Sequence, residues 1–517
     1  MKKSLFSSFL ALAMLALLTG CGGGGGGNSG GGGGGTGNPT AASLLTGQYA
    51  FSFSGTNNAG PLSIIGSFAA DGKGNITGGV EDVTLVKKSS NTIGAQTGQT
   101  LTGTYTVGSD GRGTITFNTS SDGAQNFAIV IESNNQGQLI WFDNSATGSG
   151  TFNLQDTTAF TASTLNGSFA FGLNGIDPLE TAYSRVGVFS SSSGSVASGG
   201  VSDLNNAFGT GGVNLAQPIT GGSVGAPNSS TGRGTLSLIY NSLTVKYIYY
   251  VVSANTLNLV EADDQASVYG TATLQSGGPF SAASLSGNYV VSIGGSTAAG
   301  ALAEVGQFNA DGVGTVSGVV DENFNGAPTE NATLAGSFAS VTSNGRGTIG
   351  LSFPSGTLTF AFYLANNNTA YLMEADTDAT TSGQALAQTG GPFTPSSLTG
   401  NYGLQFSGSD GVEVDFSGQV AASGSGTLTS GTIDSNFAGF ETNPVATEPY
   451  FGSTTISGGS YSVTNSTVGR GTIGFNLSTT AFGFAYYFIS PTQIALIETD
   501  LTGEITEGTG QIQPTIP

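Results

Sequence analysis

Hydrophobic and polar side chains alternate along most of this sequence. Every second side chain is apolar in residues 402–406, 473–477 and 482–488, which places the apolar side chains of each segment on one face of a strand. Turn signals such as Asp71-Gly72 separate the alternating segments, and such pairs favour tight hairpins. The pattern predicts many short antiparallel strands and no helix.

Two phrases recur in step along the chain. The first is Leu-x-Gly-x-aromatic, with its glycine at Gly47, Gly167, Gly287 and Gly400. The second is Gly-Arg-Gly-Thr, with its arginine at Arg112, Arg233, Arg346 and Arg470. The glycines of the first phrase are 113 to 120 residues apart, whereas solenoid repeats span about 20 to 50 residues. The repeats are therefore predicted to be complete domains in series.

These phrases divide the chain into six segments. The predicted segments are a signal peptide (1–20), a glycine-rich tether (21–40) and four β repeats (41–158, 159–278, 279–391 and 392–517). The linkers between repeats are short and two of them contain Gly-Gly-Pro-Phe, where proline stops a strand from continuing. We expect neighbouring repeats to form a semi-rigid rod.

Each repeat is long enough for about eight short strands. Eight antiparallel strands in about 115 residues predict an all-β meander, closed as a small barrel or folded as a sandwich. One eight-bladed propeller, with two blades for each repeat, is the alternative. The Gly-x-Tyr openings and Asp-Gly hairpins resemble those of avidin-type and lipocalin-like barrels.

The N-terminus has the three parts of an export signal. Lys2 and Lys3 precede an apolar run from Leu5 to Leu18, which is too short to span a membrane and suits a signal peptide. The tetrad Leu18-Thr19-Gly20-Cys21 resembles the lipobox of bacterial lipoproteins. This resemblance implies cleavage before Cys21, lipidation of its thiol and of the new amino terminus, and a firm membrane anchor.

The resemblance also implies a location in the cell envelope. Gly22 follows the cysteine where an aspartate would retain a lipoprotein in the inner membrane, so the expected site is the outer membrane of a diderm bacterium. The protein would face the periplasm or the cell surface. Residues 22–38 are almost all glycine, and a chain of this composition behaves as a flexible coil.

Composition excludes several classes of function. The chain has no histidine and one cysteine, which excludes Ser-His-Asp and Cys-His catalysis and histidine-based metal sites. The formal net charge is −21 and only 11 residues are basic, so nucleic acid is not an expected partner. No catalytic residue and no cofactor is predicted, apart from the calcium alternative below.

Three of the repeated arginines are followed by a glutamate at the same distance. The pairs, each 28 residues apart, are Arg233 with Glu261, Arg346 with Glu374, and Arg470 with Glu498. We predict structural ion pairs across neighbouring strands, half buried at one end of each unit. Recognition of a ligand carboxylate or a sugar by the arginine is the alternative.

Two further carboxylate patterns recur. An aspartate follows each glutamate by two positions, at Asp263, Asp376 and Asp500, a separation that glycosidase carboxylates also show. Another aspartate recurs in all four repeats, at Asp82, Asp203, Asp321 and Asp434. It is predicted to close a hairpin as an Asx turn, and a weak Ca²⁺ site is the alternative.

Fourfold repetition of a domain favours a structural function, because it lengthens a stalk or multiplies weak binding. The first hypothesis is a non-enzymatic adhesion or scaffold module whose partner is an envelope or surface protein or a glycan. The second is a carrier of small apolar or sugar ligands inside its barrels. A carboxylate-based glycan hydrolase is the third. A filled core would favour the scaffold, and an open lumen the carrier.

Overall fold

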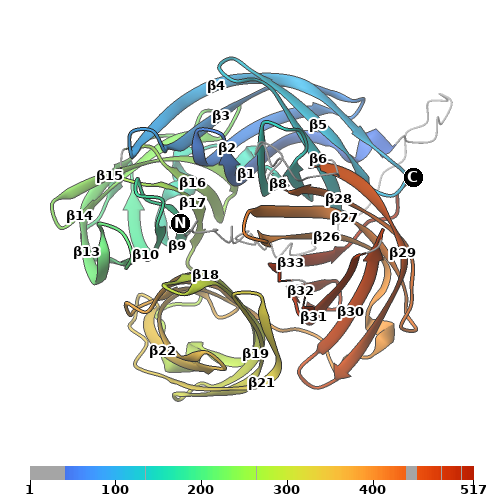
Figure 1. The fold of residues 1–517 in the computed structure, drawn as a ribbon. Coiled ribbons are helices and arrows are strands. Elements are labelled where there is room, and N and C mark those ends of the chain that lie inside the picture. The colour runs from blue at the N-terminus through green and yellow to red at the C-terminus, as the bar shows by residue number, and fades with distance from the viewer. Residues whose placement is uncertain are drawn as a thin grey trace, which may run out of the picture.

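The chain folds into four antiparallel β-barrels (Figure 1). This computed structural model describes residues 41–133, 135–263, 265–437, 451–478, 480–501 and 503–516. The predicted signal peptide, the lipidation site Cys21 and the glycine tether lie outside the described residues.

Barrels 1 and 2 are formed by the first two repeats. Barrel 1 comprises β1 (Thr46–Asn57), β2 (Gly60–Asp71), β3 (Asn75–Lys87), β4 (Thr92–Val107), β5 (Arg112–Thr119), β6 (Gly123–Ser133), β7 (Gln136–Trp141) and β8 (Ala146–Leu154). Barrel 2 comprises β9 (Gly167–Ile176), β10 (Ala182–Ser192), β11 (Ser195–Val196), β12 (Gly200–Asn206), β13 (Gly212–Val224), β14 (Arg233–Tyr240), β15 (Leu243–Ser253), β16 (Thr256–Glu261) and β17 (Ser267–Leu274).

Barrels 3 and 4 follow the same plan. Barrel 3 comprises β18 (Ser286–Thr297), β19 (Gly300–Asp311), β20 (Thr315–Phe324), β21 (Ala327–Phe338), β22 (Arg346–Phe353), β23 (Gly356–Asn366), β24 (Thr369–Glu374) and β25 (Ala379–Ala387). Barrel 4 comprises β26 (Thr399–Ser409), β27 (Glu413–Ser423), β28 (Leu428–Phe437), β29 (Phe451–Asn465), β30 (Arg470–Leu477), β31 (Thr480–Ser490), β32 (Gln493–Glu498) and β33 (Ile505–Ile512).

Each barrel is a meander in which every strand pairs with its neighbours in sequence and the last strand pairs with the first. In barrel 3, for example, β18 pairs with both β19 and β25. Barrel 2 has one additional two-residue strand, β11, and closes through the pairing of β9 with β10 and β17. The predicted all-β meander barrels are therefore confirmed, and the propeller alternative is wrong.

The helical elements within the described residues are short 3-10 helices. They are η1 (Ala41–Leu44), η2 (Thr157–Ala159), η3 (Ala162–Leu165), η4 (Ala282–Ser284) and η5 (Pro395–Ser397). No helix in the described part of the chain has the length and apolar character needed to cross a membrane.

The first repeated phrase closes one end of each barrel. Its leucine, at Leu45, Leu165, Leu285 and Leu398, is at most 5% exposed and belongs to the interior cluster of its barrel. Its glycine has φ between +101° and +138° in all four copies, a backbone conformation that side chains with a Cβ rarely adopt. The phrase thus combines an apolar plug with the backbone bend that starts the first strand.

Inward side chains fill the barrels, as the alternation predicts. Barrel 1 is packed with aromatic rings such as Phe51, Phe68 and Phe117, whose centroids lie 5.2 to 6.1 Å apart. Barrel 4 contains a similar group around Phe406 and Phe416, whose stacked centroids are 4.6 Å apart.

The four barrels form a closed ring instead of the expected rod. Barrel 1 contacts barrel 2, barrel 2 contacts barrel 3 and barrel 3 contacts barrel 4, while β6 and β8 of barrel 1 contact β26 and β27 of barrel 4. Figure 1 shows the first and the last barrel side by side. The prediction of a rod is wrong because the outer faces of the barrels are themselves complementary, which a linker length does not reveal.

Steric constraints explain why both outer positions of the Gly-Arg-Gly segment are glycine. The first has positive φ in every copy, between +68° and +89°. At the second, a Cβ would meet the ring of an aromatic neighbour in barrels 2 to 4, for example the Phe362 Cζ at 2.3 Å from Gly347. The far end of the aromatic ring therefore occupies the space that a Cβ would need.

We predict that Gly347→Ala destabilises barrel 3 by about 1 to 3 kcal/mol, the usual cost of overpacking. Gly350→Ala, on the same strand, is the matched control, because its nearest atom outside the strand lies 4.0 Å away. Chemical denaturation of the two variants checks this. Equal losses in both would refute the steric explanation.

Candidate functional site

The three repeated glutamates lie inside their barrels, each opposite an aromatic residue of the preceding strand. The register pairs Tyr247 with Glu261, Phe360 with Glu374 and Phe484 with Glu498. All three glutamates have 0% exposure. Burial raises the pKa of Glu374 to about 9 and that of Glu261 well above its ordinary value, so both side chains hold a proton at neutral pH.

The predicted arginine–glutamate pairs do not form. Arg233 lies on β14 and Glu261 on β16, and β15 pairs with both strands and lies between them. Arg346 and Glu374 are separated in the same way by β23, and Arg470 and Glu498 by β31. The prediction is wrong because it assumed that the two strands were neighbours.

Each arginine instead pairs with the repeated aspartate of the adjacent barrel. The nitrogen–oxygen distances are 2.7 Å for Arg233 and Asp82, 2.6 Å for Arg346 and Asp203, 2.5 Å for Arg470 and Asp321, and 2.8 Å for Arg112 and Asp434. The pairs join barrel 2 to 1, 3 to 2, 4 to 3 and 1 to 4. The two motifs that recur in the sequence therefore meet at every interface of the ring.

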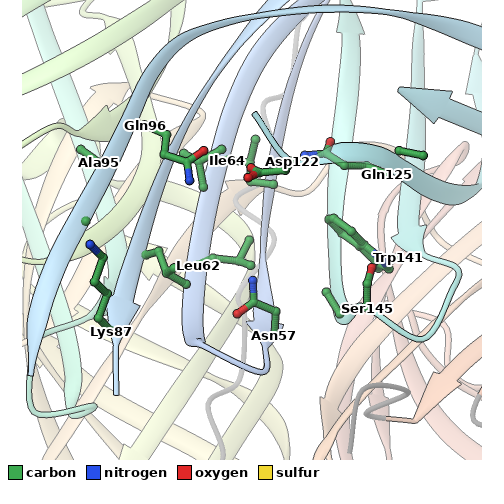
Figure 2. A pocket seen from close by; sticks show the side chains of 15 residues that line it. Asn57, Leu62, Ile64, Lys87, Ala95, Gln96, Asp122, Gln125, Trp141 and Ser145 are labelled. Carbon is green, nitrogen blue, oxygen red and sulfur yellow. Dashed lines mark hydrogen bonds between the residues drawn. The ribbon is translucent and has the colours of Figure 1, made fainter. Parts of the chain in front are cut away.

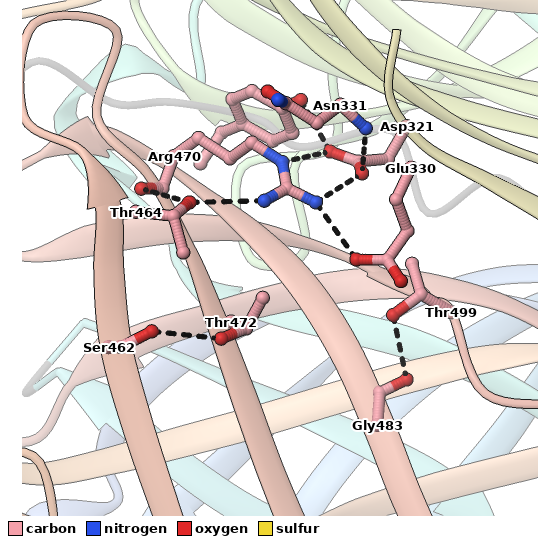
Figure 3. A network of polar contacts seen from close by, with 10 residues as sticks. Asp321, Glu330, Asn331, Ser462, Thr464, Arg470, Thr472, Gly483 and Thr499 are labelled. Carbon is pink, nitrogen blue, oxygen red and sulfur yellow. Dashed lines mark hydrogen bonds and ion pairs between the residues drawn. The ribbon is translucent and has the colours of Figure 1, made fainter.

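Arg470 and Asp321 show how the pair is built (Figure 3). The guanidinium donates from Nε and one terminal nitrogen to the two oxygens of Asp321, at 2.7 and 2.5 Å. It also donates to Glu330 and to the Thr464 hydroxyl, at 3.1 and 3.0 Å. Bidentate, charge-assisted contacts of this kind are strong and directional.

A tyrosine from the barrel that supplies the arginine completes three of the four pairs. The hydroxyls of Tyr250, Tyr363 and Tyr487 donate to Asp82, Asp203 and Asp321 at 2.6, 2.5 and 2.5 Å. The register places Val130 at the corresponding position of barrel 1. At that interface the Ser453 hydroxyl, from barrel 4 itself, donates to Asp434.

These aspartates do not close hairpin turns. They lie within β3, β12, β20 and β28, and three of them accept a backbone N–H of the next strand, from Gly98, Ala216 and Asn331. The ladder is irregular at each of those three sites. The turn prediction is wrong, and guanidinium donors contact the oxygens that a calcium ion would need.

Two further repeated positions, one a glutamine and one an asparagine, also make contacts at the interfaces, which the sequence patterns did not predict. A glutamine just after the last strand of each barrel donates to a backbone carbonyl of the adjacent barrel, at 2.5 to 2.8 Å: Gln155, Gln275, Gln388 and Gln513. Asn205, Asn323 and Asn436 do the same, at 2.8 to 3.1 Å. The sequence does carry a signal for both contacts, because each amide recurs at an equivalent position. The glutamine follows the last strand of its repeat, and the asparagine lies two residues after the repeated aspartate.

The interface between barrels 4 and 1 differs from the other three. Each of those contains an apolar cluster with residues from both barrels, such as Val188 with Met373 and Val305 with Ile497. No such cluster joins barrels 4 and 1 within the described residues. Phe142 and Phe451 make an edge-to-face contact there, with centroids 5.4 Å apart.

Buried polar groups take the place of the missing cluster. Glu132 of barrel 1 is 1% exposed and accepts from Gln136 and Gln138, and Gln138 also donates to Thr509 of barrel 4. Asp415 of barrel 4 is fully buried and accepts from the Thr147 hydroxyl of barrel 1 at 2.8 Å. Burial raises the pKa of Glu132 to about 8 and that of Asp415 to about 7.

The carboxylates offer little to a catalyst or a metal ion. The side chains of Glu261, Glu374 and Glu498 have no exposed surface. Asp263, Asp376 and Asp500 accept backbone N–H groups from the neighbouring strand at 2.7 to 3.2 Å. Within the described ranges no three Asp, Glu, His or Cys side chains are grouped so that they could bind a metal ion.

Barrel 1 has a cavity of about 380 Å³ at the end where β1 turns into β2 and β7 into β8 (Figure 2). Its wall includes the buried side chains of Leu62, Ile64, Val83 and Trp141. Polar residues surround the opening: Asn57, Lys87, Gln96, Asp122 and Ser145. This is a concave site whose lining is almost as polar as it is apolar.

No protein-family model matches the chain, and no curated protein shows significant similarity to it. The functional interpretation therefore depends on the chemistry and geometry of its own residues.

We predict that Arg470→Ala lowers the free energy of unfolding by about 3 to 5 kcal/mol, because it leaves Asp321 buried without its cation. Arg112→Ala is the comparison: the Arg112 side chain is 21% exposed and that of Arg470 only 4%, so its loss is expected to be smaller. Thermal and chemical denaturation measure both. A larger loss for Arg112→Ala would contradict this ranking.

We also predict that the interface between barrels 4 and 1 weakens as the pH rises. The folded-state pKa values of Glu132 and Asp415 lie above their ordinary values of 4.5 and 3.8. Their stabilising effect is therefore complete below about pH 4 and is lost as the pH rises through 7 to 8. Two other ionisable side chains lie near Asp415. Burial also raises the pKa of Glu413, and the charge of Lys88 opposes that rise.

Hydrogen exchange of β8 and β27 between pH 5 and 9 provides the measurement. After correction for the base-catalysed intrinsic exchange rate, lower protection at high pH is expected in the native chain, and a much flatter protection profile in the double variant Glu132→Gln, Asp415→Asn. The same pH dependence in that variant would show that other groups control the interface.

Proposed function

We propose that this protein is an exported, lipid-anchored scaffold of the bacterial cell envelope that acts without catalysis. The main support for this proposal is the cycle of four arginine–aspartate pairs, which joins every barrel to the next and the last to the first. A ring closed in this way holds four outer surfaces at fixed separations. Fixed spacing is what a platform for envelope proteins or glycans requires.

The chemistry of the chain supports a structural function. The sequence has no histidine and a single cysteine. The repeated glutamates, which a carboxylate-based hydrolase would need at its surface, have 0% exposure. The acidic balance, with a formal net charge of −21, disfavours nucleic acid as a partner.

Anchoring is inferred from the sequence alone. The lipobox-like tetrad ending at Cys21 and the glycine-rich residues 22–38 suit a lipid anchor followed by a flexible tether. The tether would let the ring tilt and turn above the membrane while the barrels keep their mutual positions. The expected location is the outer membrane.

Anchoring is tested by expressing the full chain in a diderm bacterium fed with an alkyne-tagged fatty acid. The native chain is expected to be labelled and to sediment with outer membranes. Cys21→Ser is expected to lose both properties. An unlabelled native chain would refute the lipid anchor.

The scaffold is tested by a distance measurement between opposite barrels. Lys73 and Val313 occupy equivalent exposed hairpin positions in barrels 1 and 3, and cysteines introduced at both in a Cys21→Ser chain can carry spin labels. One narrow distance distribution is expected, and Arg112→Ala with Asp434→Ala should broaden it. A broad distribution in the starting chain would contradict the scaffold, because flexibly joined barrels cannot hold partners at fixed positions.

A further inference from the structure

The cavity of barrel 1 belongs to that barrel alone. All of its lining residues lie between Asn57 and Ala146, so it is neither a gap between barrels nor a consequence of ring closure. The opposite end of the barrel is closed by η1, where the Tyr105 hydroxyl donates to the carbonyls of Ala42 and Leu45 at 3.0 and 2.8 Å. The barrel is thus a cup with a single opening.

Sequence differences between the repeats explain why barrel 1 has a cavity at this end. Gln125 lies opposite Phe117, and the same register position holds Val245, Leu358 and Phe482 in barrels 2, 3 and 4. Thr119 ends β5 where the equivalent strands end in Tyr240, Phe353 and Leu477. Barrel 1 therefore has one polar and one small residue where the other barrels have apolar bulk.

The position of Ile64 shows the same contrast. In barrel 2 the equivalent residue is Arg185, whose guanidinium carbon lies 4.1 Å from the Tyr240 ring centroid. Arg185 also donates to the Tyr183 hydroxyl at 3.2 and 3.0 Å. In barrel 4 the equivalent is Phe416, which packs against Phe406, Phe437 and Phe482. Large side chains thus occupy this position in barrels 2 and 4, whereas barrel 3 has the buried Glu304 there, opposite Ile293.

The lining of the cavity in barrel 1 also includes a residue with an unpaired hydrogen-bond acceptor. Gln125 is 3% exposed and donates from Nε2 to Glu81 at 3.1 Å, while its Oε1 has no partner. Glu81 is fully buried behind it and also has an unpartnered oxygen. A buried polar atom without a partner costs about 1 to 3 kcal/mol, so a ligand donor that reached Gln125 would recover this free energy.

The charges around the opening indicate what kind of molecule fits. Lys87 and Asp122 stand at the rim with opposite charges, so neither a cation nor an anion is favoured overall. Burial raises the pKa of Glu81 to about 8, which leaves the base of the site uncharged at neutral pH. Trp141 offers an aromatic ring whose Nε1 is already bonded to Asp143 at 2.7 Å.

We propose that barrel 1 binds a small uncharged organic molecule, with its apolar, ring-containing body against Trp141 and an N–H or O–H donor on Gln125. The inference does not depend on the scaffold function. At the position of Gln125 the other three barrels have apolar side chains, which offer no such hydrogen-bond acceptor.

Trp141 is the only tryptophan in the chain, so its fluorescence reports on this cavity. The test titrates the full chain carrying Cys21→Ser, which removes acyl chains, with N-phenyl-1-naphthylamine. This dye is neutral, aromatic and carries one N–H donor. The expected result is saturable energy transfer from Trp141 with one dye per chain. The anionic analogue 8-anilinonaphthalene-1-sulfonate is expected to bind at least tenfold more weakly.

Two variants locate the dye. Gln125→Phe introduces the inward-facing residue of barrel 4, Phe482, into the cavity and is expected to abolish energy transfer. Leu358→Phe, at the equivalent position of barrel 3, is the matched control and should bind as the parent does. Gln125→Leu, which introduces the residue of barrel 3, should weaken binding about tenfold.

The results that overturn the proposal are equally specific. Unchanged energy transfer in Gln125→Phe, or equal loss in Leu358→Phe, would show that the dye binds elsewhere. Equal affinity for the neutral and the anionic dye would refute the uncharged class of ligand. Thermal melting of each variant confirms that a loss of binding is not a loss of fold.

Discussion

The guanidinium–carboxylate pair between adjacent barrels, whose aspartate is buried at every interface, is the interaction on which this architecture depends. A buried charge without its partner is costly, whereas a bidentate and fully bonded pair is tolerated. The arginine and the aspartate of one pair lie on different barrels. Arg470 finds its partner in Asp321, and Arg233 and Arg346 depend on another barrel in the same way. Arg112 also pairs with Asp110 of its own repeat, at 2.9 Å. All four pairs between barrels form together only when the chain closes on itself.

The fourth interface shows how a cyclic arrangement is completed in a linear chain. Three interfaces join barrels that are consecutive in sequence, and there tyrosines and apolar clusters surround the ion pair. The closing interface keeps the ion pair and the glutamine contact, through Arg112 and Gln513, but replaces the apolar cluster with acids such as Glu132. Three interfaces thus combine the ion pair with an apolar cluster, whereas the closing interface combines it with buried polar groups. A buried acid also lies between barrels 3 and 4, where Glu507 accepts from Ser292.

The sequence predicts the barrels well because strand alternation, turn signals and repeat length are local properties. It predicts the contacts between them poorly. In a tandem repeat any two repeated positions keep a nearly constant spacing, so the 28 residues from Arg346 to Glu374 carried no information about contact. The true partner of Arg346, Asp203, lies in the preceding repeat. Which outer face meets which is decided by the three-dimensional packing of whole barrels, and this packing also turned the expected rod into a ring.

The same separation of local and global constraints explains how one repeat could acquire a cavity. The ring depends on outward-facing residues, namely the aspartate, the arginine and the amides, whereas the filling of a barrel depends on inward-facing ones. In β3, Asp82 points outward to Arg233 while its neighbour Glu81 points inward to Gln125. Adjacent residues of one strand therefore serve the two requirements independently. Barrel 1 can exchange apolar bulk for Gln125 and Thr119 without disturbing either of its interfaces, and a binding site can arise in one copy of a structural repeat while the ring is preserved.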